Sequence, residues 1–192
     1  PGVAYAKSIP TFLATPNHSV SAYQTLHSLS LHLFRHDAIW NPWPVVDLPL
    51  VAVGVSVTSR VLVLVWATIV ARNALPIVSA CALLAPVVIV MPVGEDHHFV
   101  LLLPALVLAI FHEFRTRQFA TLSFLVLSVF LLGLPVHELA PATEAGWHAL
   151  AAYPRVWGSI ALLLWATLKS RFIAPNHYSE VRTTTPAASV KS

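Results

Sequence analysis

The chain has 192 residues, of which 57% are hydrophobic and only 10% carry a charged side chain. Soluble domains average roughly 25% charged residues, so we expect an all-α integral membrane protein rather than a soluble fold. The net charge of +3 is spread between loops, which argues against nucleic acid as a partner. The chain begins at Pro1 without a signal-peptide pattern, so we expect it to be a piece of a longer protein.

Residues 1–46 precede the first long apolar run and are expected to lie outside the membrane. Leu26, Leu29, Leu33 and Phe34 recur at helical spacing, with histidine and arginine residues between them. This pattern predicts an amphipathic helix that lies in the outer membrane interface.

Five apolar segments follow, and each is a candidate transmembrane helix once its polar flanks are included. A spanning helix needs about 20 residues. We expect crossings at residues 48–70, 75–93, 97–113, 119–136 and 154–169. Polar residues at their ends, such as Glu113 and Lys169, are expected to reach the headgroup level. The bundle would then occupy residues 47–171, and residues 172–192 would form a disordered cytoplasmic tail because they lack an apolar period.

The distribution of charge predicts the topology. Arg72, Arg115 and Arg117 occupy two of the turns, and further basic residues follow the last segment. Most acidic residues lie in the alternate loops. Because cytoplasmic loops carry the excess of Lys and Arg, we expect residues 1–46 outside and the tail inside. Five crossings satisfy both placements.

The polar run Glu95-Asp96-His97-His98 separates two apolar segments and is the first candidate site. Ionisable groups at a membrane edge are costly because desolvation disfavours charge. A histidine beside an acid can bind a phosphate oxygen or pass a proton. Consecutive residues on an α-helix diverge by about 100°, so we expect only one of the two imidazole rings to point into the protein.

Two other interpretations of this run stay open. It could be polar only because it lies in a wet outer loop. It could also belong to a metal site, completed by His137 and Glu138 on the same side, although no ligand spacing singles that out. We expect no metal and no cofactor.

Arg60 is the second candidate, because it lies near the middle of the first apolar segment. An arginine at the bilayer centre costs at least ~2.5–3.5 kcal/mol, so it should face the bundle interior or a water-filled cavity. It could be the counter-charge of an anionic ligand. Alternatively, it pairs with an acid elsewhere, or the helix is shifted so that Arg60 lies nearer one surface.

Two stretches resemble glycosyltransferase family 87. The first stretch starts at Ala22-Tyr23-Gln24-Thr25-Leu26 and runs to Asn41-Pro42 and Asp47-Leu48-Pro49, and it resembles an outer loop of that family. The second, Met91-Pro92-Val93-Gly94-Glu95-Asp96-His97-His98, resembles the family's acid-His-His run, and Leu102-Leu103-Pro104 matches its apolar continuation. The resemblance covers roughly residues 5–170, the C-terminal half of such a protein.

The resemblance implies a GT-C-like multi-helix bundle in the bacterial plasma membrane. Its function would be transfer of a mannose- or arabinose-type sugar from a polyprenyl-phosphate donor to a glycolipid or glycan acceptor on the outer face. Asp96, His97 and His98 would line the donor phosphate pocket. Gln24, Arg35 and Asn41 would lie in the loop above it. The catalytic acid is expected in an outer loop near the N-terminus of such enzymes, outside this sequence.

Two alternatives to this function remain at the level of sequence. One is a polytopic transporter or carrier with Arg60 and the histidine cluster on its pathway. The other is a truncated, inactive fragment, because 192 residues do not include the family's catalytic acid.

Overall fold

The computed structural model describes residues 21–72, 74–94, 96–117, 119–135 and 145–173. Within these ranges the chain is helical and contains no strand. The α-helices are α2 (Leu26–Phe34), α3 (Pro49–Arg72), α4 (Pro76–Val90), α5 (Leu103–Thr116), α6 (Phe119–Gly133) and α8 (Pro154–Ile173). Two 3-10 helices, η2 (Asp96–Leu102) and η4 (Gly146–Ala152), precede α5 and α8.

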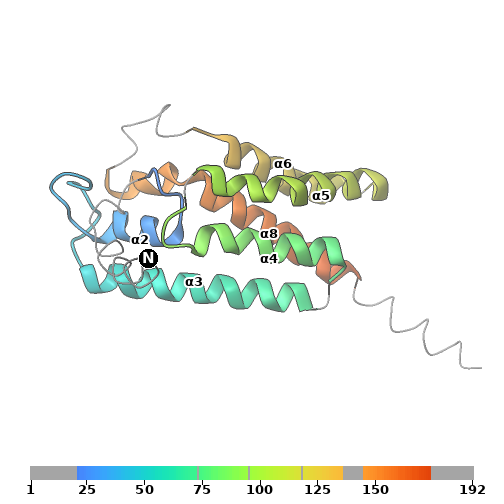
Figure 1. Cartoon of the computed structure of the whole chain (residues 1–192), viewed down its shortest axis with the longest axis horizontal. Helices are drawn as coiled ribbons and strands as arrows, with labels where there is room; N and C mark the ends of the chain where they lie inside the picture. Colours follow the sequence, from blue (N-terminus) through green and yellow to red (C-terminus); the bar gives the residue numbers. More distant parts are fainter. Residues whose placement is uncertain (1–20, 73, 95, 118, 136–144, 174–192) are drawn as a thin grey trace, which may run out of the picture.

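The five long helices lie side by side and alternate in direction, whereas α2 lies at one end of the bundle (Figure 1). The N-terminus of α3 and the C-terminus of α4 share the end that holds α2, η2 and η4, which we call the α2 end. The turns after α3 and α5 lie at the opposite end. The alternating loops therefore emerge at opposite ends of the bundle, as the charge pattern requires.

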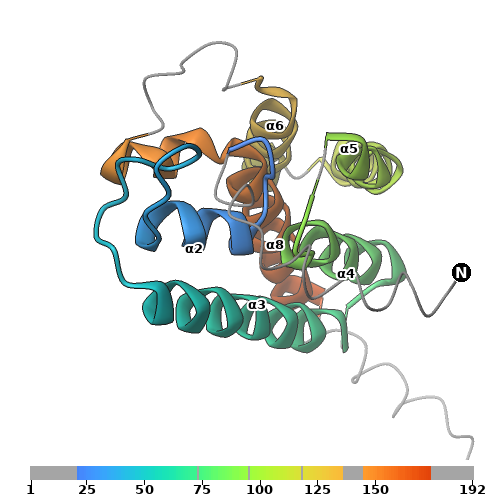
Figure 2. The same cartoon turned by 60° about the vertical axis from the view of Figure 1, so that its left-hand side comes forward.

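Helix α8 is the centre of the bundle and packs against α4 and α6 (Figure 2). Its Leu162, Leu163 and Trp165 are fully or almost fully buried. Close approach of α6 depends on Gly158, whose carbonyl accepts a hydrogen bond from Ser128 Oγ at 2.7 Å. The core is therefore built around one helix, with α3 and α5 at the edges.

Proline marks the start of several helices. Pro49, Pro76 and Pro154 are the first residues of α3, α4 and α8. This position suits proline, because the first N–H groups of a helix have no intrahelical partner and the ring presets φ. Helix α5 ends at Thr116, and its C-cap residue Arg117 adopts a left-handed conformation with φ of 53°.

The outer surface of the bundle is apolar over most of its length, which fits a helical membrane protein. Two helices, Pro49–Arg72 and His97–Thr116, are long and apolar enough to cross a membrane. The pair Gly146–Ala152 and Pro154–Arg171 would be a third span, bent by 59°. The apolar helices α4 and α6 have 15 residues each, or about 22 Å, against a hydrocarbon core of about 30 Å. Five crossings therefore stay a prediction, whereas two or three candidate spans are observed.

The short helix α2 differs from the expected amphipathic helix with a water-facing side. Seven of its residues are buried, and these include the polar Ser28, Ser30 and His32. Helix α2 contacts α3, α4 and η4, so neighbouring elements cover it on several sides. Its polar groups find partners within the protein, because Ser28 Oγ and His32 Nδ1 both contact the hydroxyl of Tyr153.

Candidate functional site

The predicted histidine pair lies on η2, at the α2 end of the bundle. His97 is exposed and His98 is half-buried. Their ring centroids are 4.1 Å apart with planes inclined by 32°, so the two rings lie over one another. Of the two residues, His98 is the more buried, and the expectation that only one ring points into the protein stays a prediction. Asp96 is the first residue of the same 3-10 helix.

An apolar groove is lined in part by Phe99 and Val100, the two residues that follow the histidine pair in the sequence. It has a volume of about 280 Å³ and runs between residues of η2 and α5 on one side and α6 on the other. Its lining is Phe99, Val100, Leu103, Leu106, Val129, Leu132, Gly133 and Arg155. All but one of these residues are apolar, so the groove complements a hydrocarbon chain.

Arg155 is the charged residue of this groove and comes from the start of α8. Its guanidinium carbon lies 5.5 Å from the centre of the Phe99 ring, within the range of a cation–π contact. Its Nε donates to the carbonyl of Leu132 at 3.2 Å, which ties α8 to the end of α6. Arg155 was not among the site residues predicted from the sequence. The available signal was an arginine immediately after Tyr153-Pro154, at the start of an apolar helix.

Gln24 lies inside the protein rather than in an open loop above a ligand. Its side-chain amide donates to the carbonyls of Ser21 at 2.5 Å and Ala152 at 2.9 Å. Its Oε1 accepts the backbone N–H of Arg155 at 3.3 Å. Because the amide is buried and engaged on both sides, its role is to join the start of α2 to the junction of η4 and α8.

Asn41 and Arg35 close the C-terminal end of α2. The buried amide of Asn41 donates to the carbonyls of His32 at 2.7 Å and Arg35 at 2.6 Å. These are carbonyls that the end of a helix leaves without an intrahelical donor. Arg35 is the C-cap residue, and its backbone N–H bonds to Leu31. The Asn41 amide is therefore a helix cap, and its contact with a ligand stays a prediction.

Between these two residues, Asp37 orders the loop after α2. Its Oδ1 accepts the N–H groups of Trp40 at 2.8 Å and Ile39 at 2.9 Å. The Trp40 hydrogen bond, the largest effect, holds the pKa of Asp37 below its ordinary value of 3.8. Asp47 fixes the same loop by accepting the His36 N–H at 2.9 Å.

Arg60 lies halfway along α3. The histidine pair lies on η2, and the groove is lined by residues of η2, α5, α6 and α8. The Arg60 side chain is half-buried, and its Nε donates to the carbonyl of Ser56 at 3.0 Å, one turn earlier in the same helix. The hydroxyl of Ser56 in turn contacts His27 Nδ1 of α2 at 2.9 Å. The structure therefore does not gather Arg60 with the histidine pair around one pocket.

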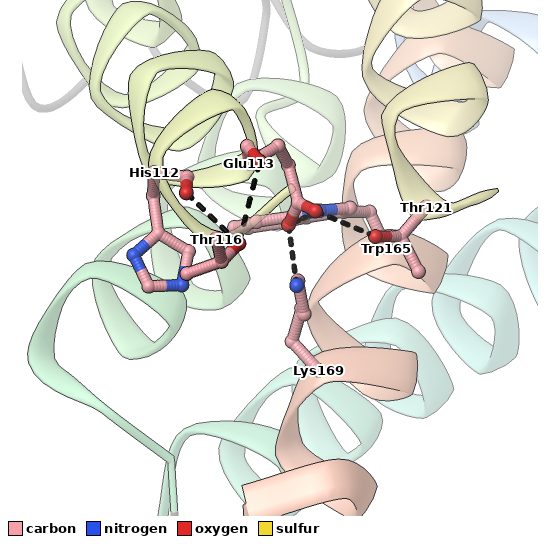
Figure 3. A network of polar contacts seen from close by, with 6 residues as sticks. All are labelled: His112, Glu113, Thr116, Thr121, Trp165 and Lys169. Carbon is pink, nitrogen blue, oxygen red and sulfur yellow. Dashed lines mark hydrogen bonds and ion pairs between the residues drawn. The ribbon is translucent and has the colours of Figure 1, made fainter. Parts of the chain in front are cut away.

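The most deeply buried charges belong to a second polar centre, near the opposite end of the bundle (Figure 3). Glu113 Oε1 lies 2.7 Å from Lys169 Nζ, and these side chains are 0% and 2% exposed. Trp165 Nε1 donates to Oε1 at 3.0 Å, and Thr121 Oγ1 donates to Oε2 at 2.7 Å. Glu113 and Lys169 pair with each other inside the bundle instead of extending from its surface, and their expected place at the headgroup level stays a prediction. The available signal in the sequence was that each residue lies near the end of an apolar segment.

Within the ranges that the structure describes, no group of three or more His, Cys, Asp or Glu residues could hold a metal ion. The class that fold and surface define is a helical protein with two or three helices able to cross a membrane. Comparison with protein-family models, curated proteins and solved structures finds no match. The resemblance to glycosyltransferase family 87 therefore stays a prediction from the motifs quoted above.

Proposed function

We propose that this chain is the C-terminal part of a membrane glycosyltransferase. It would move a mannose- or arabinose-type sugar from a polyprenyl-phosphate donor to a glycolipid or glycan acceptor. The observation that supports this most is the groove between α5 and α6, which is apolar along its length and has Arg155 in its wall. The histidine pair on η2 immediately precedes the groove residues Phe99 and Val100.

The groove and its polar end match the two parts of such a donor. A polyprenyl chain is a flexible hydrocarbon, and burying it against apolar side chains is favourable. A phosphate needs hydrogen-bond donors and positive charge, and the guanidinium of arginine supplies both in a planar fork. His97 and His98 add ring N–H donors. The phosphate would lie between Arg155 and the two rings, with the chain along the groove.

The same groups would assist the transfer step. When the acceptor hydroxyl attacks the anomeric carbon, the bond from that carbon to the phosphate oxygen breaks. The departing polyprenyl phosphate gains negative charge, and fixed cations and N–H donors stabilise that charge as it develops. The acceptor proton would pass to the catalytic carboxylate that such enzymes carry in an outer loop near their N-terminus. Gln24 would act as a positioning residue, because it joins the start of α2 to the junction of η4 and α8. Asn41 would do so by capping the C-terminal end of α2.

The proposed site would face the outer side of the membrane. The α2 end carries Asp37, Asp47 and Asp96, whereas Arg72 and Arg117 lie at the other end. An excess of Lys and Arg marks the cytoplasmic side. Donor and acceptor would then meet outside.

A transporter is the second candidate, and the half-buried Arg60 in the middle of α3 is the observation that favours it. Charged residues inside membrane helices often mark substrate pathways. Counterflow of labelled sugar phosphate or lipid phosphate across sealed proteoliposomes would support the transporter. Transfer of label into a product would support the enzyme.

The test uses the full-length protein in proteoliposomes with labelled polyprenyl-phosphate mannose and, separately, the arabinose donor. Transfer into a glycolipid acceptor should fall about 100-fold in His97→Ala and His98→Ala, since loss of one such donor to a developing anion costs about 10²–10³ in rate. His148→Ala is the matched control, because His148 is an exposed histidine at the same end of the bundle. Unchanged transfer in both variants would remove the histidines from the donor site.

A further inference from the structure

The outward face of α3 holds a charge that the described part of the chain does not neutralise. Arg60 is the twelfth of the 24 residues of α3, so its Cα lies about 18 Å from either end. Its Nε donates to the Ser56 carbonyl, and no carboxylate lies within ion-pair distance of it in the described part of the chain. A hydrogen bond to a helix carbonyl leaves the positive charge uncompensated, which is costly in hydrocarbon.

An apolar surface flanks Arg60 on α3. Val53, Val57, Val61 and Leu64 are 54%, 48%, 52% and 42% exposed. Together with Arg60 they follow the spacing i, i+4, i+7, i+8 and i+11, which places them along one face of a helix. We call this surface the Arg60 stripe. Helix α3 lies at the edge of the bundle, and only Ala52, Ser56, Ala67 and Val70 of its residues are buried (Figure 2).

Among the described residues, no acid is placed so that a second copy of the chain would supply the missing counter-charge. The chain has eight acidic residues, and Glu113 is the only one within the long helices. Glu113 is already bound to Lys169, near the end of the bundle opposite α2. The other acids of the described ranges lie at the α2 end. Pairing two Arg60 stripes would also bring two cations together.

A lipid phosphate is a poorer match. The guanidinium reaches toward Ser56, which still lies about 10 Å inside the N-terminal end of α3. Phosphates occupy the polar regions outside the hydrocarbon core. A carboxylate on a neighbouring membrane helix, in contrast, can lie at this depth and accept two N–H bonds from the planar guanidinium.

From the stripe and its charge we infer that α3 docks a membrane-spanning helix from outside these 192 residues, and that this helix carries an Asp or Glu near its middle. The carboxylate pairs with Arg60, and apolar side chains of the partner cover the Arg60 stripe. This inference does not rest on the proposed donor site, because that site lies between α5 and α6. Loss of the partner contact at α3 and loss of donor binding in the groove can therefore be measured independently.

The experiment places a photoreactive benzoylphenylalanine at Val57 of the full-length protein in native membranes. Val55, which faces away from the stripe on the same helix, is the control position. Mass spectrometry of the adducts at Val57 should identify an apolar peptide with an Asp or Glu from outside residues 1–192. The adduct yield should fall about tenfold in Arg60→Gln and be retained in Arg60→Lys. Replacing the partner's acid by its amide should cause the same loss.

Three kinds of adduct would overturn the inference. They are adducts with lipid alone, adducts with a second copy of this chain, and adducts with a peptide that has no acidic residue. An acidic peptide whose yield does not depend on Arg60 would also overturn it. Folding of each variant is checked by its thermal denaturation in detergent, so that a loss of adduct reports on the contact alone.

Discussion

The carboxylate of Glu113 and the ammonium of Lys169 lie 2.7 Å apart in the interior of the helix bundle. Glu113 belongs to α5 and Lys169 to α8, and Thr121 of α6 donates to the same carboxylate (Figure 3). The ion pair and this hydrogen bond together join three helices. Hydrogen bonds from Thr121 and Trp165 satisfy both carboxylate oxygens, as a buried charge requires.

Removing one member of this pair should be strongly destabilising. In Glu113→Gln the Lys169 ammonium keeps its charge and loses its counter-charge in a buried position. In Lys169→Met the Glu113 carboxylate loses its counter-charge in a buried position. Each variant should lose about 3–5 kcal/mol of unfolding free energy, because an uncompensated buried charge remains. Denaturation of the purified protein in detergent measures the loss.

The double variant Glu113→Gln/Lys169→Met is the control for this prediction. It contains neither charge, so its stability should lie closer to that of the wild type than either single variant does. Additive losses in the double variant would contradict a direct interaction between the two side chains.

The positions of the long helices could be predicted from the sequence, because apolar runs and proline mark their starts. The expected segments 48–70, 75–93 and 154–169 correspond to α3, α4 and α8, whose starts differ by at most one residue. The ends differ by two to four residues, since no comparable residue marks them. The burial of Glu113 and Lys169 could not be predicted this way. It depends on which helices become neighbours, and periodicity within one segment does not contain that information.

The same limit applies to the candidate site. The run Asp96-His97-His98 could be selected from the sequence because polar residues between two apolar segments are costly there. The place of Arg155 in the groove could not be predicted, since it depends on the contact of α8 with η2 and α6. Gln24 and Asn41 were selected through a resemblance, and their buried hydrogen bonds serve the fold. A motif in one sequence does not distinguish a ligand contact from a structural one.

Close packing of α6 on α8 predicts a cost for a single methyl group at Gly158. A Cβ there would lie 2.9 Å from Leu132 Cγ and 3.0 Å from the Ser128 carbonyl oxygen. Gly158→Ala should therefore lose about 1–3 kcal/mol of unfolding free energy through overpacking. Gly54→Ala is the matched control, because a Cβ at Gly54 meets nothing within 4 Å. It should gain about 0.5–1 kcal/mol from helix propensity, and equal effects at both sites would refute the packing explanation.

The hydroxyl of Tyr153 joins α2 to the bend between η4 and α8. It lies 3.0 Å from Ser28 Oγ and 3.1 Å from His32 Nδ1, and the Tyr153 side chain is fully buried. Tyr153→Phe leaves these polar groups without the hydroxyl and should cost about 1–3 kcal/mol. Proteolysis of the 35–48 loop should become faster as α2 loosens. A Tyr153→Phe protein with unchanged denaturation and proteolysis would show that the hydroxyl contributes nothing.

Asp37 should make the loop after α2 sensitive to acid. Its pKa is lowered in the folded protein, mainly by the Trp40 N–H. A carboxyl with a lowered folded pKa stabilises the fold above its unfolded pKa, and that contribution is lost as the pH falls through the folded value. The stability difference between the wild type and Asp37→Asn should therefore be constant at neutral pH and shrink below about pH 4. A difference that persists unchanged in acid would contradict the assignment.

The proposed donor site predicts that the groove binds a polyprenyl phosphate. Native mass spectrometry of the full-length protein with decaprenyl phosphate should show one bound lipid. Val129→Trp fills the groove, and Val126→Trp places the same bulk on another surface of α6. The affinity for decaprenyl phosphate should fall at least about tenfold in Val129→Trp and in the His97→Ala/His98→Ala double variant. Val126→Trp should bind it as the wild type does. Equal affinity in all four proteins would contradict a donor site in this groove.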